Sequence, residues 1–387
     1  MSTAPVVLDI GLVLLLAAGL GWVARRVGLP SVIGFLAAGL AVSPFTPGYV
    51  ADHEQIELLA DVGVVLLLFE VGIEVDLGRL RREQRGLLWA APLQLAITWG
   101  ASSAVLVVAG LQPLGAILVG LAVAMSSSVV IVNITRSRRR TTDRPTEQAL
   151  LGWSVLQDVT GVAAAAIVFA FSGIGGRPLP VAIGGLALFA VLAVVAAQVL
   201  PAVLRQLRAE HDLFLIVSVA SGLVVAALGA VVFGVPLALA AFVAGLAISD
   251  RPETAEARRR LLPFRDVFAV LFFVAVGSLV DPSSLPGAVP LAALLVGLVV
   301  VAKVGVAWLL GRAARLEARP LQLAVGLGQL GEFGYVLAGI ALAAGALAAG
   351  EFTAVLAAIV VTIGASAVLV RTVGRPAESP QPVPPGT

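Results

Sequence analysis

Long apolar runs separated by short polar segments dominate this sequence, and they predict an all-α protein that crosses a membrane many times. A helix needs about 20 mostly apolar residues to cross a bilayer, and the chain offers such runs repeatedly. Breakers and charged clusters divide them into thirteen expected spans: 6–24, 29–43, 56–76, 86–110, 113–135, 146–172, 180–204, 212–233, 235–249, 264–280, 287–311, 320–345 and 352–370.

The arginines support this division, because they fall almost entirely in every second connection, as the positive-inside rule requires of cytoplasmic loops. Their clusters lie at 25–26, 79–85, 136–144, 205–208, 251–265 and 312–319, with two more after the last span. No basic residue precedes the first span, which indicates a retained span rather than a cleaved signal peptide. We therefore expect a bacterial plasma (inner) membrane, with the N-terminus outside and the C-terminus cytoplasmic.

Composition agrees with a membrane bundle and narrows the chemistry. The chain is 59% hydrophobic and 12% charged, with a mean hydropathy of +1.05. It has no cysteine, which excludes disulfides and thiolate metal sites, and its two histidines, His53 and His211, lie in or beside expected loops. We expect no cofactor, no metal beyond a transported alkali cation, and no nucleic-acid partner.

Two pairs of segments suggest an internal repeat. Segment 28–43 recurs as 234–249 at an offset of 206, and segment 61–76 recurs as 266–281 at an offset of 205. An offset of seven spans, an odd number, places the two copies in opposite orientations. This predicts two inverted six-span repeats joined by a linker helix at 180–204, an architecture typical of secondary transporters.

Polar and glycine-rich runs interrupt the fifth and twelfth spans at equivalent positions of the two copies. Ser126, Ser127 and Ser128 interrupt the fifth span, and the run GLGQLGEFG, with Gln329 and Glu332, interrupts the twelfth. Unwound backbone at membrane depth is tolerated where it faces protein or a wet cavity, so we expect two crossed discontinuous helices there. The alternative is that the glycines serve only close helix packing.

A carboxylate in the sixth span is the first candidate for function. Asp158, preceded by Gln157, lies in a span that is otherwise almost entirely apolar. A charge at this depth is costly and marks a functional site by default. Burial favours the protonated carboxyl and a nearby cation favours the ionised form, so a proton and an alkali cation could compete for the same oxygens. Gln157 could add a carbonyl ligand or simply bond to a neighbour.

The chain's one lysine, Lys303, is the second candidate. It lies in the middle of the run VGLVVVAKVGVAWLL, whereas every other basic residue is an arginine. A buried lysine is costly unless it is paired or hydrated, which favours a functional role over packing alone.

Two glutamates, Glu332 and Glu70, each allow more than one role. Glu332 could compensate helix-end dipoles or hold the crossing together rather than bind the ion. Glu70 could line a funnel that attracts cations, or belong to the salt-bridged end of the third span.

These segments resemble the membrane domain of Kef-type potassium:proton antiporters, within the cation:proton antiporter superfamily of Nap- and Nha-type exchangers. The resemblance is carried by GLPSVIGFLAAGL, LLLFEVGIEVDLGRLRR, AMSSSVVIV, the Gln157–Asp158 pair, LFFVAVGSLVD, AKVGVAWLLGR and GLGQLGEFGYVLA, in that order. Kef-type proteins usually continue into a cytosolic nucleotide-binding domain, whereas this chain ends in a short tail. Gating by nucleotide is therefore not implied, and a separate cytosolic regulatory subunit would be a partner.

The resemblance implies an elevator mechanism in a homodimer. An ion-carrying core, 86–172 and 286–371, would slide against a dimerising scaffold, 1–85 and 205–285, while 372–387 forms a disordered cytoplasmic tail. It also implies that Asp158 carries the ion or proton and that Lys303 pairs with it when no ion is bound.

Exchange of potassium or sodium for protons is thus the leading hypothesis. A single carboxylate suggests an electroneutral cycle, although Lys303 could carry a second proton. A symporter of an organic anion on the same scaffold, or an ion-binding channel or sensor subunit, are the alternatives. An enzyme is disfavoured, because the sequence has no Ser/His, paired-Asp or metal-ligand arrangement.

Overall fold

The computed structural model describes residues 4–46, 53–74, 86–127, 130–131, 142–172, 178–207, 210–247 and 252–373. Ser128 and most of the expected tail lie outside this part of the chain. Within it every regular element is a helix. The helices are α1 (Ala4–Arg26), α2 (Ser31–Ala41), α3 (His53–Glu74), α5 (Leu87–Val108), α6 (Pro113–Ala124), α8 (Arg144–Ser172), α9 (Leu179–Gln206), α10 (His211–Val231), α11 (Leu237–Ala247), α12 (Pro252–Ser278), η1 (Pro282–Ser284), α13 (Leu285–Leu298), η2 (Val299–Gly305), α14 (Val306–Ala313), α15 (Pro320–Leu327), α16 (Glu332–Ala343) and α17 (Ala349–Val373).

Each apolar run of the sequence contains one of these helices or a broken pair of them. Among the described residues, eight helices are long and apolar enough to cross a membrane by themselves, and four more are apolar but shorter. The all-helical class is therefore correct, while the number of thirteen spans stays a prediction.

The tenth expected span differs from the structure at its start. We expected it to begin at residue 264, but α12 begins at Pro252, twelve residues earlier. The added turns, PETAEARRR, are rich in good helix formers and have proline at the first helical position, where it is favoured. An apolar run marks where a helix is buried, whereas helix propensity extends the same helix into polar sequence.

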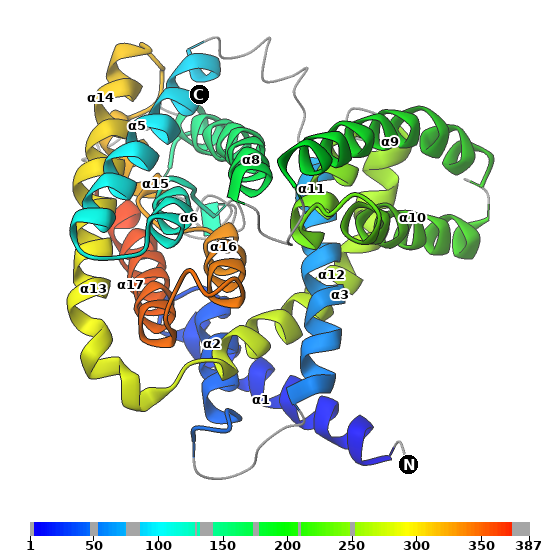
Figure 1. The fold of residues 1–387 in the computed structure, drawn as a ribbon, viewed down its shortest axis with the longest axis horizontal. Coiled ribbons are helices and arrows are strands. Elements are labelled where there is room, and N and C mark those ends of the chain that lie inside the picture. Colours follow the sequence, from blue (N-terminus) through cyan, green and yellow to red (C-terminus); the bar gives the residue numbers. More distant parts are fainter. Residues whose placement is uncertain are drawn as a thin grey trace, which may run out of the picture.

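The helices form two groups, which lie side by side in Figure 1. One group, here called the α8 group, contains α5, α6, α8, η1, η2 and α13–α17. The other, the α12 group, contains α1–α3 and α9–α12, with α3 packed along both α11 and α12. The two groups differ from the expected ranges at η1, which lies in the expected scaffold range, and at α9, which was expected as a separate linker helix. The transport roles of the two groups stay a prediction.

The two sequence-related segments pack through matched glycine crossings in the α12 group. A methyl group added to Gly39 of α2 would lie 2.1 Å from the Val274 carbonyl oxygen of α12, and one added to Gly245 of α11 would lie 2.1 Å from the Phe69 carbonyl oxygen of α3. Gly39 and Gly245 are 206 residues apart, as are Gly28 and Gly234, which both have positive φ angles of 88° and 71°. The two crossings therefore repeat the same local packing.

Replacing Gly39 by alanine is expected to destabilise the protein by roughly 2 kcal/mol, because backbone cannot move aside for the methyl group as a side chain could. The measurement is the apparent melting temperature in detergent. Gly297→Ala is the matched control, since a methyl group at Gly297 of α13 meets nothing within 4 Å. Equal melting temperatures for the two variants would contradict the tight crossing.

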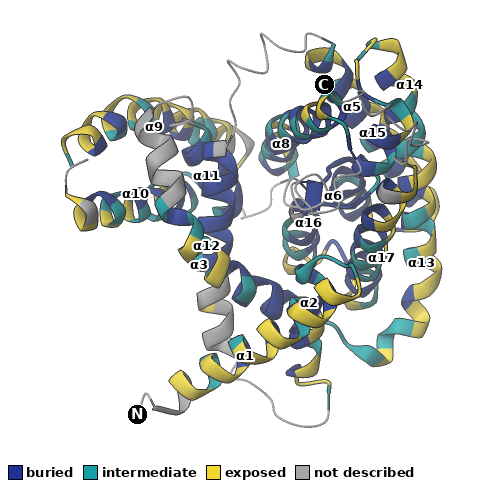
Figure 2. Cartoon of the chain, turned by 180° about the vertical axis from the view of Figure 1, so that it is seen from behind, coloured by how far each residue is buried: buried dark blue, intermediate teal, exposed yellow. Residues whose placement is uncertain are grey.

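Large apolar side chains also cover much of the outer surface. Figure 2 shows exposed residues along the outer faces of α1, α9, α10 and α13. They include Leu15 (71% exposed), Val191, Val231 (77%) and Val289 (60%). An exterior as apolar as this suits contact with lipid rather than water.

Candidate functional site

Two helices break within the α8 group, where the sequence predicts discontinuous spans. α6 ends at Ala124 and Met125 follows in an extended conformation, while α15 ends at Leu327 and α16 begins at Glu332. The breaks touch one another, because a methyl group on Gly331 would lie 2.7 Å from the Ser126 carbonyl carbon. A side chain larger than hydrogen would clash here, so Gly331 allows the two breaks to cross.

Side chains from the neighbouring helices satisfy the backbone groups that the breaks expose. The Ser126 hydroxyl donates to the Leu327 carbonyl at 2.9 Å, which joins one break to the other. From α17, the Thr362 hydroxyl accepts the Leu330 N–H at 3.2 Å and Ser366 donates to the Val325 carbonyl at 2.9 Å. Irregular backbone in an apolar setting requires such partners. Sequence reasoning missed both α17 residues, which lie in an otherwise apolar helix.

Lys303 is fully buried and holds both breaks at once. Its ammonium donates to the Met125 carbonyl at 2.6 Å and to the Gln329 carbonyl at 2.5 Å. These oxygens lie at or just beyond the C-terminal ends of α6 and α15, where the helix dipoles favour positive charge. Lys303 itself belongs to η2, a π-helical segment between α13 and α14. Local π-helical turns are frequent at functional sites.

Asp158 and Gln157 lie on α8 and are both fully buried. Asp158 and Lys303 are both fully buried in the α8 group, and their ordinary charges are opposite. The Gln157 amide donates to the Ala124 carbonyl at 3.2 Å, the last carbonyl of α6 before the break. The residues expected to bind the ion thus gather around the crossing, although their roles stay a prediction.

Three polar residues beside this site were not singled out from the sequence. Gln94 and Thr98 lie on α5, and Trp153 lies on α8. The Gln94 side-chain oxygen accepts hydrogen bonds from both Trp153 and Gln157, and the Gln94 amide nitrogen donates to Thr98. All three are fully buried. Their one signal in the sequence is the placing of two hydrogen-bonding side chains one helical turn apart within an apolar span.

Gln329 lies within the second break, and its side-chain amide donates weakly to the Ser127 and Gly326 carbonyls at 3.4 and 3.3 Å. The Ser127 hydroxyl accepts the Val130 N–H at 3.2 Å. Ser128 lies outside the described residues, as does the side chain of Glu332, whose backbone begins α16.

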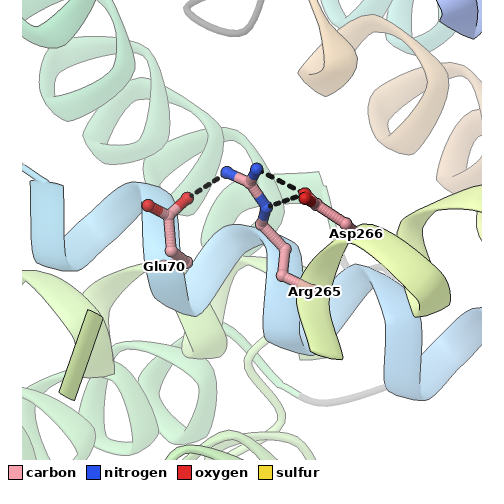
Figure 3. A network of polar contacts seen from close by, with 3 residues as sticks. All are labelled: Glu70, Arg265 and Asp266. Carbon is pink, nitrogen blue, oxygen red and sulfur yellow. Dashed lines mark hydrogen bonds and ion pairs between the residues drawn. The ribbon is translucent and has the colours of Figure 1, made fainter. Parts of the chain in front are cut away.

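Glu70 lies away from the crossing, in the α12 group. Its buried carboxylate accepts from Arg265 of α12 at 2.7 Å, and Arg265 also pairs with Asp266 at 2.6 Å. Figure 3 shows Arg265 between the two carboxylates, joining α3 to α12. A buried pair with this geometry gives Glu70 a structural role, and its role in a cation-attracting funnel stays a prediction.

The site offers the chemistry of a hard monovalent cation. It combines one carboxylate with amide and backbone carbonyl oxygens, the ligand types that alkali and other hard cations prefer. Within the described residues no three His, Cys, Asp or Glu side chains gather as they would around a transition metal. Lys303 adds one buried positive charge to the site, bonded to the two helix breaks.

Comparisons with known proteins agree with this geometry. Residues 12–373 match the family described as sodium/hydrogen exchanger, transmembrane. The chain is 32% identical over 345 residues to the putative cation/proton antiporter YbaL of Escherichia coli, which covers 85% of this chain but only 62% of YbaL. It is 29% identical over 347 residues to the ammonium/H⁺ antiporter subunit AmhT of Alkalihalophilus pseudofirmus, covering 87% of each chain.

The fold is also shared with a solved structure. The sodium proton antiporter MjNhaP1 of Methanocaldococcus jannaschii, solved at pH 8, superposes with a TM-score of 0.76 over 97% of this chain and 99% of that one, at 16% identity. Together with the apolar helices, this likeness identifies the fold of a multi-pass membrane protein.

Proposed function

Because the chain belongs to the sodium/hydrogen exchanger family, we propose that it exchanges a monovalent cation for protons across a bacterial plasma membrane. The proton and the cation compete for the Asp158 carboxylate, with Gln157 as a second ligand. The observation that carries this proposal is a buried lysine that bonds to two helix breaks at once, beside α8, which carries the fully buried Asp158 and reaches the first break through Gln157.

Lys303 has two tasks in this cycle. Its ammonium stabilises the broken ends of α6 and α15 through the Met125 and Gln329 carbonyls. It also neutralises ionised Asp158 when no cation is bound, and gives up that role when a cation or a proton arrives. Because Lys303 stays charged, the cation-loaded site and the proton-loaded site carry the same net charge, so exchange of one cation for one proton moves no net charge across the membrane.

Movement of the site follows an elevator scheme in this proposal. The α8 group carries Asp158 and slides against the α12 group, which forms the contacts of a homodimer. Apolar residues supply the contact between the groups, including a T-shaped pair of Phe242 on α11 and Phe333 on α16 with ring centroids 5.7 Å apart. An apolar contact without fixed polar bonds can be remade after sliding at little cost. The N-terminus lies outside and the C-terminus lies in the cytoplasm.

The transported cation is potassium, sodium or ammonium. Ammonium is included because the similar protein AmhT is an ammonium/H⁺ antiporter subunit. AmhT is also called a subunit, which supports a separate regulatory partner for this chain. All three cations are monovalent and prefer oxygen ligands, so the size of the coordinated ion decides among them.

Proton flux in proteoliposomes tests the proposal. Purified protein is reconstituted with a pH gradient, and potassium, sodium and lithium are added in turn while internal pH is followed. Ammonium is tested as a competitor of the transported ion, because ammonia crosses bare lipid. Competition for one carboxylate predicts that the apparent KM for the cation rises as pH falls, by about tenfold per pH unit once the carboxyl is mostly protonated.

Either of two results would overturn the proposal. Wild-type protein that moves no protons with any cation would exclude exchange. A cation KM that does not change with pH would show that the proton and the cation bind at separate groups. Protein-free liposomes provide the baseline for both measurements.

A further inference from the structure

A chain of buried hydrogen bonds joins α5 and α8 beside the proposed ion site. The Trp153 indole N–H of α8 donates to the Gln94 side-chain oxygen of α5 at 3.2 Å, and the Gln157 amide nitrogen donates to the same oxygen. At its other end, the Gln94 amide nitrogen donates to the Thr98 hydroxyl at 3.0 Å. Thr98 in turn donates to the Ala302 carbonyl at 2.7 Å.

Trp153 determines which atom is the donor and which the acceptor in each of these hydrogen bonds. An indole N–H can only donate, so the atom that Trp153 meets on Gln94 must be the oxygen. The Gln94 NH₂ group then faces the Thr98 hydroxyl, which accepts a hydrogen bond from it and donates one to the Ala302 carbonyl. A side-chain amide placed alone could turn over and exchange its oxygen and nitrogen. Trp153 removes that freedom from Gln94.

The same constraint extends to Gln157. Because Gln94 presents an oxygen, Gln157 must present its NH₂ group, and its second N–H is taken by the Ala124 carbonyl at 3.2 Å. Both donors are then used, and the Gln157 side-chain oxygen is left fully buried with no hydrogen-bond partner among the described residues. A buried acceptor without a partner costs free energy unless a ligand satisfies it.

We propose that Trp153 and Gln94 are positioning residues that fix the Gln157 amide so that its oxygen, and not its nitrogen, is offered to the transported cation. The inference rests on the proposed function, because it assigns a ligand to that same site. An oxygen coordinates an alkali cation, whereas a turned amide would present two N–H donors and repel it. This series of hydrogen bonds ends at the carbonyl of Ala302, the residue before Lys303. The same bonds therefore also stabilise the π-helical turn that carries the lysine.

The test compares Gln94→Leu and Trp153→Phe with wild type in proteoliposomes. Gln94→Leu removes the oxygen that orients Gln157, and we expect the apparent KM for the cation to rise about tenfold or more, as loss of a bond to a charged group predicts. The maximal rate at saturating cation stays close to that of wild type. The pH at which protons inhibit exchange, extrapolated to zero cation concentration, also stays unchanged, because Asp158 still binds the proton.

Trp153→Phe keeps an aromatic ring and removes the indole donor together with part of the buried volume, and it covers the case in which Gln94→Leu does not fold. We expect a smaller rise in KM for this variant, because Gln94 can turn over but is not lost. Gln322→Leu is the matched control, since Gln322 is another buried glutamine of the α8 group whose amide donates to the Val370 carbonyl at 3.3 Å, outside the chain of bonds. Its KM should equal that of wild type.

The outcomes separate this inference from the proposed function. An unchanged KM in Gln94→Leu and Trp153→Phe, in a wild-type background that exchanges ions, overturns the positioning role alone. A joint fall of maximal rate and melting temperature in all three variants, Gln322→Leu included, shows a packing effect and also overturns it. No cation-dependent flux in wild type overturns the proposed function itself.

Discussion

Asp158→Asn is expected to reduce cation-driven proton movement to the level of protein-free liposomes. Asparagine keeps the volume and one oxygen of the side chain, but it neither ionises nor takes up a proton. The variant therefore loses the group for which the proton and the cation compete in the proposed cycle. The measurement is internal pH in proteoliposomes under the conditions that give the largest flux with wild type.

Loss of flux is informative only if the variant is folded. Removing the negative charge leaves the buried Lys303 ammonium with its two carbonyl acceptors, so we expect the fold to persist with a lower melting temperature. Asp143→Asn is the matched control, because Asp143 forms a partly exposed ion pair with Arg319 at 2.8 Å. That variant should exchange ions at the wild-type rate. Full flux in Asp158→Asn would show that another group carries the proton.

Much of the helical arrangement could be predicted because a lipid environment leaves few alternatives. Apolar runs become helices there, since every backbone group must be bonded within its own segment. The same rule made the serine and glycine runs visible as breaks, and α6 and α15 end at these runs. Asp158 and Lys303 could be singled out because charges are costly at that depth.

The features of the site that could not be predicted from the sequence depend on contacts between residues far apart in the chain. The family resemblance implied that Lys303 pairs with Asp158, but the contacts of Lys303 with the Met125 and Gln329 carbonyls exist only once two broken helices meet beside η2. Gln94 and Thr98 could not be recognised either. Neutral polar residues occur in apolar helices for many reasons. The role inferred for these two depends on the hydrogen bond from Trp153 to Gln94, and Trp153 lies 55 residues beyond Thr98 in the chain.

Glu70 shows a second limit of prediction from the sequence, because local spacing could not decide between its two possible roles. From the sequence, Glu70 could belong to an ion pathway or to a salt-bridged helix end, because its spacing from Glu74 fits either. The structure adds Arg265, 195 residues away, as its ion-pair partner. A partner at that separation cannot be found by local spacing, although the repeat already suggested that α3 and α12 are related segments.

Crosslinking α11 to α16 is expected to stop exchange completely and reversibly. Phe242 and Phe333 lie in contact across the boundary between the α12 group and the α8 group. If the α8 group slides during transport, this contact must break in each cycle. A double variant, Phe242→Cys with Phe333→Cys, joined by a short bifunctional thiol reagent with a cleavable link, would hold the groups in one position. The chain has no cysteine of its own, so the reagent has no other target.

The control for this experiment is a crosslink within one group. Ser284 of η1 and Thr353 of α17 share a hydrogen bond of 3.0 Å and both belong to the α8 group, so Ser284→Cys with Thr353→Cys should exchange ions equally well before and after crosslinking. The Phe242/Phe333 variant must be active before the reagent is added and again after cleavage of the link. Continued exchange while α11 and α16 are joined would mean that these helices keep their contact throughout the cycle. Access to Asp158 would then have to alternate through changes inside the α8 group, at the breaks themselves, which are held together by Lys303.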